Sequence, residues 1–532
     1  MSEARTWRTA LALAAVAVAV QAPALRGTLI WDDFKLLHQT DLYTSASKWL
    51  ESVTTPLGRE TFYWRPVATT SFLIDTWIYG AAEWGHRLTA ALLHGAATAA
   101  AFLLLHRLTR STPVALVAAL VVAGHPVHVE TVTWISARFD LLAGLLGLGV
   151  LLVSPDGMRQ TSRTWGLAAA GLTMLAVGSK ESAFLLPALA VLWTAACAAP
   201  GSQFPWRAAA WPAAGAGAAV FVRLEAIGFL FGTRPASVAE AGGALEHLLL
   251  VGRATATSLL TLVVPWGTVG PMHRGERPIP PGDALGWAGI AAGLLLVAVT
   301  VRLIARRRPS GWLFAAFLLG LAPVAQIVPL DLAGGLHAAD RFLYLPAFFL
   351  IAALASLAAD ALATRPDRAR RFAVAAGALV LALTVGRLVL LPRWNDPVRF
   401  WRWAAEMAPD ADVAQANLAQ ALLESGDVAA VEAPARRAGR PGLPYLVEAL
   451  RQQQRAEEAR RELDAALFAW PGDAEALVLR GWVLLDLGRA AEATEDFGAA
   501  IVLEAQGPAR LEPLTPRASE GLARAREMLR PK

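Results

Sequence analysis

Charge and cysteine are both scarce in this chain. Of its 532 residues only 17% are Asp, Glu, Lys or Arg, whereas 55% are hydrophobic, and the mean hydropathy is +0.44. A soluble protein of this length would expose far more charge, so the composition excludes an ordinary soluble protein and indicates a polytopic membrane protein. With a single cysteine, Cys197, an intramolecular disulfide is excluded as well.

The chain also lacks a basic patch interleaved with aromatic residues along one surface element. Its formal net charge is +5, and the basic residues stand mostly in short loops between apolar runs. This distribution indicates membrane topology, and it argues against a nucleic-acid partner.

No apolar run that is long enough to span a membrane follows residue 393. Residues 1–393 alternate apolar runs with short polar loops, while residues 394–532 are rich in Ala, Glu, Arg and Leu. We therefore predict an all-α protein with a membrane domain (1–393) followed by a non-cytoplasmic helical domain (394–532). Residues 9–20 could be the core of a signal peptide, but no clear small-residue cleavage site follows, so we expect a retained first helix.

Eleven apolar runs are candidate membrane spans, although several are shorter than the roughly 20 residues that cross a bilayer. A further run, 244–266, is ambiguous. If it crossed the membrane, Arg306–Arg308 and the cluster Arg365–Arg371 would both face outward, against the positive-inside rule. We therefore predict that it is re-entrant or interfacial, with the N-terminus cytoplasmic. The predicted spans are 8–25, 86–106, 112–126, 139–154, 164–179, 183–199, 208–224, 284–304, 311–330, 342–361 and 372–391.

This topology gathers polar clusters on the non-cytoplasmic side. The first external loop, about 26–84, begins GTLIWDDFKLL and places Asp32 and Asp33 where the membrane meets water. They could be ordinary loop or helix-capping acids. Alternatively, one of them could act as a base that takes a proton from a hydroxyl nucleophile.

A second cluster is HPVHVETVTWISARFD, which carries His125, His128, Glu130, Arg138 and Asp140. Ionisable groups at a membrane boundary are costly and suggest function. The two histidines and the glutamate could bind a metal, but their spacing matches no specific metal motif. We favour a polar network that binds an anionic group, and we expect no cofactor, with a divalent metal as the alternative.

Two further clusters lie later in the chain. Lys180 and Glu181 in VGSKESAFLLP could be a simple helix end, or Lys180 could hold a phosphate. Arg341, followed by Tyr344 in AADRFLYLP, could anchor the helix at the interface or pair with a phosphate. Together the clusters describe a cavity with an acid and several cations, which suits a lipid-phosphate substrate better than a water-soluble ion.

The C-terminal domain contains a repeat signature. In AEALVLRGWVLLDLGRAAEATEDFGAAIVLEA (474–505), Gly481, Gly488, Ala493, Phe497 and Ala500 follow the tetratricopeptide spacing, in which small residues let two helices approach. Such arrays usually bind peptides or proteins. We therefore predict a tetratricopeptide solenoid.

Eight stretches, in collinear order over most of the chain, resemble the family of transmembrane, tetratricopeptide-repeat O-mannosyltransferases and their bacterial relatives. They are WDDF, YWRPVATTSFLID, GHRLTAALLHGAATAAAFLLL, HPVHVETVTWISARFDLLAG, SKESAFLLPAL, TRPAS, ADRFLYLPA and WNDPVRFWRWAAEMAPD.

The resemblance implies a GT-C-type glycosyltransferase that moves a sugar, such as mannose, from a polyprenyl-phosphate carrier to an acceptor outside the cytoplasm. It implies a catalytic role for Asp33 or Asp32, with Asp33 slightly favoured. The substrate-binding residues that it implies are Arg65, His125, His128, Glu130, Arg138, Asp140, Lys180, Glu181, Arg341 and Tyr344.

The expected partners are a polyprenyl-phosphate-linked sugar, membrane lipid, and a Ser or Thr of an exported protein presented to the repeats. A lipid or glycan acceptor, a non-enzymatic membrane scaffold and a transporter are the alternatives. The Ala- and Arg-rich composition suggests a bacterial inner membrane, with the repeats in the periplasm.

Overall fold

The computed structural model describes residues 2–38, 45–55, 63–154, 163–199, 202–228, 242–274, 278–328, 336–506 and 514–530. These residues form 24 α-helices and one two-stranded sheet, in which β1 (His273–Arg274) pairs antiparallel with β2 (Leu336–Ala338). The predicted all-α class is thus confirmed. The TRPAS stretch (233–237) lies outside the described residues, as do two parts of the first external loop.

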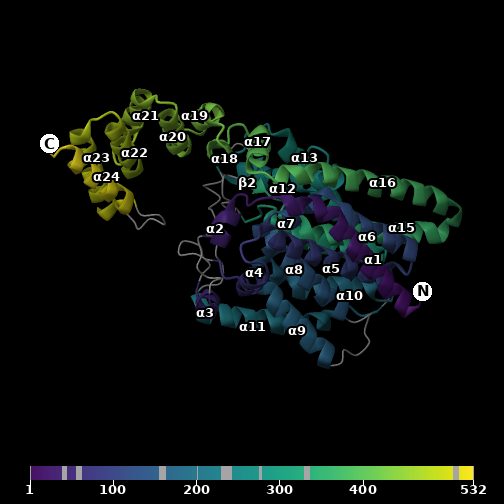
Figure 1. The fold of residues 1–532 in the computed structure, drawn as a ribbon. Helices are drawn as coiled ribbons and strands as arrows, with labels where there is room; N and C mark the ends of the chain where they lie inside the picture. Colours follow the sequence, from purple (N-terminus) through teal and green to yellow (C-terminus); the bar gives the residue numbers. More distant parts are fainter. Residues whose placement is uncertain are drawn as a thin grey trace. The chain divides into compact units, whose positions relative to one another are not determined.

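The chain divides into two compact units, Met1–Asp396 and Pro397–Lys532, which we call the membrane unit and the tail unit. The predicted boundary at 393/394 falls close to this division. The helices of the membrane unit are α1 (Glu3–Gln21), α2 (Asp32–His38), α3 (Ala46–Thr54), α4 (Pro66–Tyr79), α5 (Glu83–Thr109), α6 (Thr112–Gly124), α7 (Val129–Thr133), α8 (Arg138–Val153), α9 (Arg163–Val177), α10 (Leu186–Cys197), α11 (Ala210–Ile227), α12 (Ala244–Val263), α13 (Ala284–Ala305), α14 (Pro309–Leu321), α15 (Tyr344–Thr364) and α16 (Ala369–Leu390) (Figure 1).

The membrane unit is a multi-pass helical bundle. Among the described residues of this unit, six helical segments are long and apolar enough to cross a bilayer. A seventh candidate is a pair, Thr112–Gly124 and Pro126–Thr133, bent by 46°, where the proline removes a backbone donor and ends the first helix. The six segments are Glu3–Arg26, Glu83–Thr109, Ile135–Val153, Ala284–Ala305, Asp340–Thr364 and Pro366–Trp394.

The other predicted spans are also helical but do not meet this criterion. They correspond to α9, α11, Glu181–Cys197 and Pro309–Val324, so the number eleven stays a prediction. The ambiguous run is α12, an unbroken helix of 20 residues. This helix is not among the six segments that meet the span criterion, so its predicted re-entrant or interfacial placement stays a prediction.

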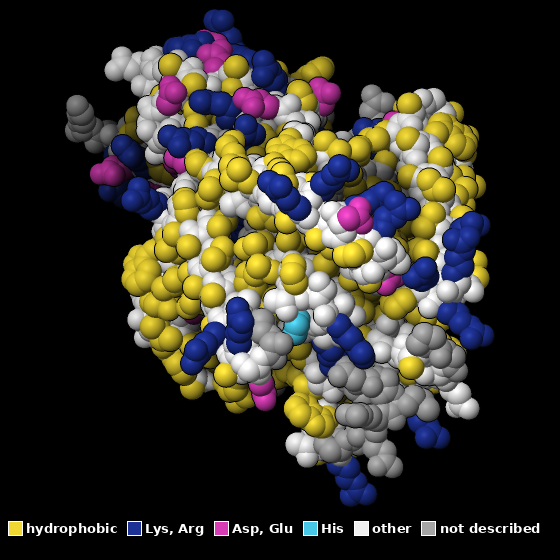
Figure 2. Space-filling view, turned by 90° about the vertical axis from the view of Figure 1, so that its right-hand side faces the viewer, with side chains coloured by type: hydrophobic (Ala, Val, Ile, Leu, Met, Phe, Trp, Pro, Cys, Tyr) yellow, Lys and Arg dark blue, Asp and Glu magenta, His cyan; other side chains and the backbone are white. Residues whose placement is uncertain are grey.

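The two ends of the membrane unit differ. Figure 1 places α2, α3 and β2 at one end and the N-terminus, with the turn between α15 and α16, at the other. Figure 2 looks onto this second end, where Lys and Arg side chains outnumber Asp and Glu side chains over the middle and lower part of the face. Such a bias is typical of a cytoplasmic face, and the orientation stays a prediction.

Helices α12 and α13 pack closely against each other because glycines line their contact, Gly252 on α12 and Gly286 and Gly289 on α13. A Cβ added at Gly289 would lie 1.7 Å from the carbonyl oxygen of Gly252, and one added at Gly252 would lie 2.1 Å from that of Gly286. Neither neighbour is a flexible side chain, so a methyl group would have to push the two helices apart.

We therefore expect Gly289→Ala to destabilise the membrane unit by about 1–3 kcal/mol, measured as a lower thermal unfolding midpoint in detergent. Gly377→Ala on α16 is the matched control, because a Cβ there meets nothing within 4 Å. An equal drop in midpoint for both variants would contradict the close approach.

The tail unit is a series of short helices: α17 (Pro397–Met407), α18 (Asp412–Glu424), α19 (Glu432–Ala438), α20 (Leu443–Gln452), α21 (Ala456–Ala469), α22 (Ala474–Asp486), α23 (Ala490–Gln506) and α24 (Thr515–Met528). Gly481 on α22 faces Phe497 on α23, since a Cβ at the glycine would lie 2.7 Å from the ring. This small residue is where the repeat pattern requires one. The tetratricopeptide assignment itself stays a prediction.

Candidate functional site

The predicted polar clusters lie where membrane helices are interrupted. A short 3-10 turn directly precedes each of the helices α7, α8, α10 and α15. These turns are Pro126–His128, Ile135–Ala137, Glu181–Leu185 and Asp340–Leu343. Each turn begins or ends a helix, so it brings charged side chains to a helix end instead of the lipid-facing middle of a span.

Arg341 and Glu130 form the first ion pair of the site. The Arg341 guanidinium donates to one carboxylate oxygen at 2.5 Å, and its backbone N–H donates to the other at 3.0 Å. Glu130 is buried, whereas 18% of the Arg341 side chain is exposed. The guanidinium also lies over the rings of Trp134 (5.1 Å) and Phe342 (4.8 Å). It is therefore held in place with part of its surface available.

Lys180 and Asp140 form the second pair. The Lys180 ammonium also lies 4.5 Å from the centre of the Phe342 ring, so the same ring contacts both Lys180 and Arg341. Burial lowers the pKa of Lys180 to about 8; Arg65 and Arg341 act in the same direction, while Asp140 opposes it. A lysine in this environment can change its charge near neutral pH.

Glu181 joins two arginines from distant parts of the chain. It accepts a hydrogen bond from Arg65 at 3.0 Å and one from Arg223 at 3.2 Å. The Arg65 guanidinium lies over the rings of Tyr63 (4.2 Å) and Phe139 (4.6 Å). Arg223, on α11, was not predicted from the sequence, although a charged residue inside an apolar run was the available signal.

These contacts bring six of the predicted residues into one charged cluster: Arg65, Glu130, Asp140, Lys180, Glu181 and Arg341. The side chains of its three cations are partly exposed: 12% for Arg65, 13% for Lys180 and 18% for Arg341. Each is oriented by a carboxylate and supported by an aromatic ring. Cations that are held in this way can bind an anion with little further ordering.

The two adjacent acids of the first loop have opposite environments. Asp32 is exposed and interacts through space with Arg341. Asp33 is 0% exposed, and one of its oxygens accepts from Ser136 N–H at 2.8 Å and from Ser136 Oγ–H at 2.7 Å. Burial raises the pKa of Asp33 to about 6, against the lowering effect of the Ser136 bonds and of Arg87. Only Asp32 is accessible to an acceptor hydroxyl in this structure.

Arg138 lies away from the exposed part of the site. It is completely buried and pairs with Asp75 at 2.6 Å, and it donates to the carbonyl of His86 at 2.7 Å. Asp75 also accepts from Thr89 at 2.7 Å. Burial would raise the pKa of Asp75, but His86, Arg138 and Thr89 together lower it below its ordinary value. Arg138 is therefore placed to hold α4 against α5 and α8.

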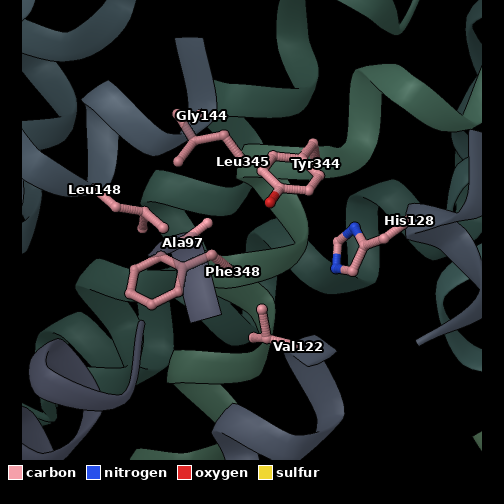
Figure 3. A pocket seen from close by; sticks show the side chains of 8 residues that line it. All are labelled: Ala97, Val122, His128, Gly144, Leu148, Tyr344, Leu345 and Phe348. Atoms are coloured by element: carbon pink, nitrogen blue, oxygen red, sulfur yellow. The ribbon is translucent and has the colours of Figure 1, made fainter. Parts of the chain in front are cut away.

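The remaining predicted residues, His125, His128 and Tyr344, are also buried. His125 Nε2 donates to the carbonyl of Leu262 at 3.0 Å, and the Tyr344 hydroxyl bonds His94 Nδ1 at 2.9 Å. His128 packs edge-on against Tyr344 with 4.9 Å between ring centroids. Figure 3 shows both side chains pointing into one small cavity. The predicted role of these three residues in binding an anion stays a prediction.

Among the described residues, no group of three or more His, Cys, Asp or Glu side chains could hold a metal ion. His273 and Asp340 form a further polar pair that was not predicted from the sequence, with 2.7 Å between His273 Nε2 and Asp340 Oδ1. It joins β1 to the turn that carries Arg341. Its two members are 67 residues apart, and no local pattern links them.

Comparison with known proteins gives partial matches. No protein-family model matches the sequence. The Protein O-mannosyl-transferase tmtc2 of Xenopus laevis is 32% identical over 139 residues, which cover 23% of this chain and 17% of that protein. The Protein O-mannosyl-transferase Tmtc2 of Drosophila melanogaster is 35% identical over 127 residues, which cover 23% of this chain and 14% of that protein.

Among solved structures, ArnT from Cupriavidus metallidurans in the apo state aligns with 98% of this chain and 78% of its own, at 16% identity and a TM-score of 0.40. A score this low carries no conclusion. The matched region spans less than a fifth of the length of each curated relative. Over that region the predicted resemblance is confirmed: this chain is similar to the Tmtc2 protein O-mannosyl-transferases.

Proposed function

We propose that this protein is a membrane glycosyltransferase that takes a sugar from a polyprenyl-phosphate carrier and transfers it to a hydroxyl group, most readily a Ser or Thr of an exported protein. The observation that carries the proposal is the charged cluster, in which three oriented, partly exposed cations lie at one site with the exposed carboxylate of Asp32 acting on one of them.

The reaction assigns a task to each group. As the acceptor oxygen bonds to the anomeric carbon, the bond between that carbon and the phosphate oxygen breaks, and its electron pair leaves with the polyprenyl phosphate. Asp32 takes the proton of the acceptor hydroxyl. Lys180, Arg65 and Arg341 stabilise the charge that develops on the departing phosphate.

The carboxylates of the cluster limit its net charge. Glu130, Asp140 and Glu181 each pair with a cation, so their negative charges offset the positive charges of the cluster and weaken the repulsion between its cations. A phosphate that enters would share these cations with the carboxylates. The tail unit would then select the polypeptide acceptor, as its predicted repeats suggest.

The test uses purified protein in lipid nanodiscs and a panel of polyprenyl-phosphate sugars. We expect wild type to release polyprenyl phosphate from at least one donor and to label a protein of a periplasmic extract. The comparison variants are Asp32→Asn and, as a matched control, Glu51→Gln, an exposed acid in the same loop that pairs with Lys48. Absence of turnover with every donor, while the tail unit still captures a partner, would favour the scaffold instead.

The alkaline pH dependence follows from Lys180. Because its pKa is about 8, the ammonium loses its charge as the pH rises through 8, and its attraction for phosphate is lost with it. We expect the donor KM to be constant between about pH 6.5 and 7.5 and to rise above about pH 8. Lys180→Arg keeps its charge, so its KM should stay low to about pH 9.5. An identical alkaline rise in both proteins would contradict this role of Lys180.

A further inference from the structure

The backbone at Trp31, just before the two acids, has an unusual conformation. Its φ is 53°, in the left-handed region, which a bulky aromatic residue rarely adopts unless its surroundings enforce it. Two contacts do so. The Trp31 ring stacks on Trp134, with centroids 5.0 Å apart and planes 18° apart, and Asp33 accepts hydrogen bonds from the backbone and side chain of Ser136.

Both contacts end on the same short connection between α7 and α8. Trp134 and Ser136 are two residues apart in that connection, and both are buried. The segment therefore holds the first loop on either side of Asp32, through Trp31 and through Asp33. Asp33 turns inward and Asp32, between the two attachments, turns outward.

The Trp134 ring also contacts Arg341, one of the three cations of the charged cluster. The Arg341 guanidinium lies 5.1 Å from the Trp134 ring, so one ring contacts both Trp31 and Arg341. A displacement of Trp31 would thus move Asp32 relative to Arg341 without removing any group that touches a substrate.

We propose that Trp31 is a positioning residue. Its left-handed backbone and its stacking on Trp134 direct Asp32 outward, where its charge acts on Arg341, and Asp33 inward, onto Ser136. The consequence for turnover rests on the proposed function, whereas the orientation of the two acids does not.

The kinetic test compares Trp31→Ala and Trp31→Phe with Trp206→Ala, which removes an exposed tryptophan elsewhere in the membrane unit. For Trp31→Ala we expect kcat to fall at least tenfold while the donor KM stays within twofold, because the phosphate-binding cations remain. Trp31→Phe keeps an aromatic ring and should retain kcat within threefold. Equal losses in kcat and donor affinity that phenylalanine does not rescue would indicate general damage and overturn the proposal.

The orientation is tested separately by thiol labelling of full-length protein carrying Cys197→Ser. Reporter cysteines replace Asp32, which is exposed, and Leu36, which is buried on the same helix. We expect a maleimide to label Asp32→Cys at least tenfold faster than Leu36→Cys, and Trp31→Ala to narrow this ratio at least threefold. Trp206→Ala should leave the ratio unchanged.

The two readouts separate this proposal from the proposed function. A narrowed labelling ratio in a protein that turns over no donor supports the positioning role and rejects only the enzymatic one. An unchanged ratio together with an unchanged kcat in Trp31→Ala overturns the positioning role, even if wild type is an active transferase.

Discussion

Replacing Asp32 by asparagine is expected to lower turnover by about 10²- to 10⁴-fold, the usual contribution of a positioned general base. The amide has nearly the shape of the carboxylate but cannot accept the proton of the acceptor hydroxyl. Because Asp32 is exposed, the substitution should leave the thermal unfolding midpoint almost unchanged. Release of polyprenyl phosphate and sugar transfer are the measured quantities.

Asp33→Asn is the matched comparison, since it makes the same chemical change one residue later. Its amide oxygen can still accept both hydrogen bonds from Ser136, and it no longer places a charge in a buried position. We expect it to retain turnover within about tenfold of wild type. The opposite result, with Asp33→Asn inactive and Asp32→Asn active, would assign the base to Asp33 and would mean that the loop rearranges when substrate binds.

The second large effect is expected at the buried pair of Arg138 and Asp75. Asp75→Leu would leave the Arg138 guanidinium, which is completely buried, without its carboxylate. Breaking a buried pair in this way costs about 3–5 kcal/mol, because the remaining charge stays desolvated. We expect a greatly reduced yield of folded protein and a lower unfolding midpoint.

A double variant separates the charge from the packing. Asp75→Leu combined with Arg138→Met removes both charges, and it should recover much of the stability lost by Asp75→Leu alone. The control is Arg308→Ala, which breaks the exposed pair with Asp360 and should cost no more than about 1 kcal/mol. A double variant as unstable as the single one would show that side-chain shape, and not the unpaired charge, dominates at this position.

The locations of the helices could be predicted because membrane helices have a local signal. In lipid every backbone polar group must be paired within its own segment, so an apolar run of sufficient length becomes a helix. The described residues of all eleven predicted spans are mainly helical for this reason. The continuous form of α12 was harder to predict, because charge balance indicates where a segment lies relative to the membrane and not whether its helix is unbroken. The predicted span 112–126, in contrast, ended close to Gly124, where α6 stops.

The residue types of the candidate site were also apparent from the sequence, because ionisable side chains are rare in an apolar chain. Local sequence patterns were enough to predict a helical membrane protein with acids and cations where its spans end. Which of these side chains meet follows from the packing of the helices. Arg65 pairs with Glu181 across 116 residues and Glu130 with Arg341 across 211, and of two adjacent aspartates one is buried on Ser136 while the other is exposed. Such pairings depend on how distant helix ends pack against one another, which no local pattern of residues encodes.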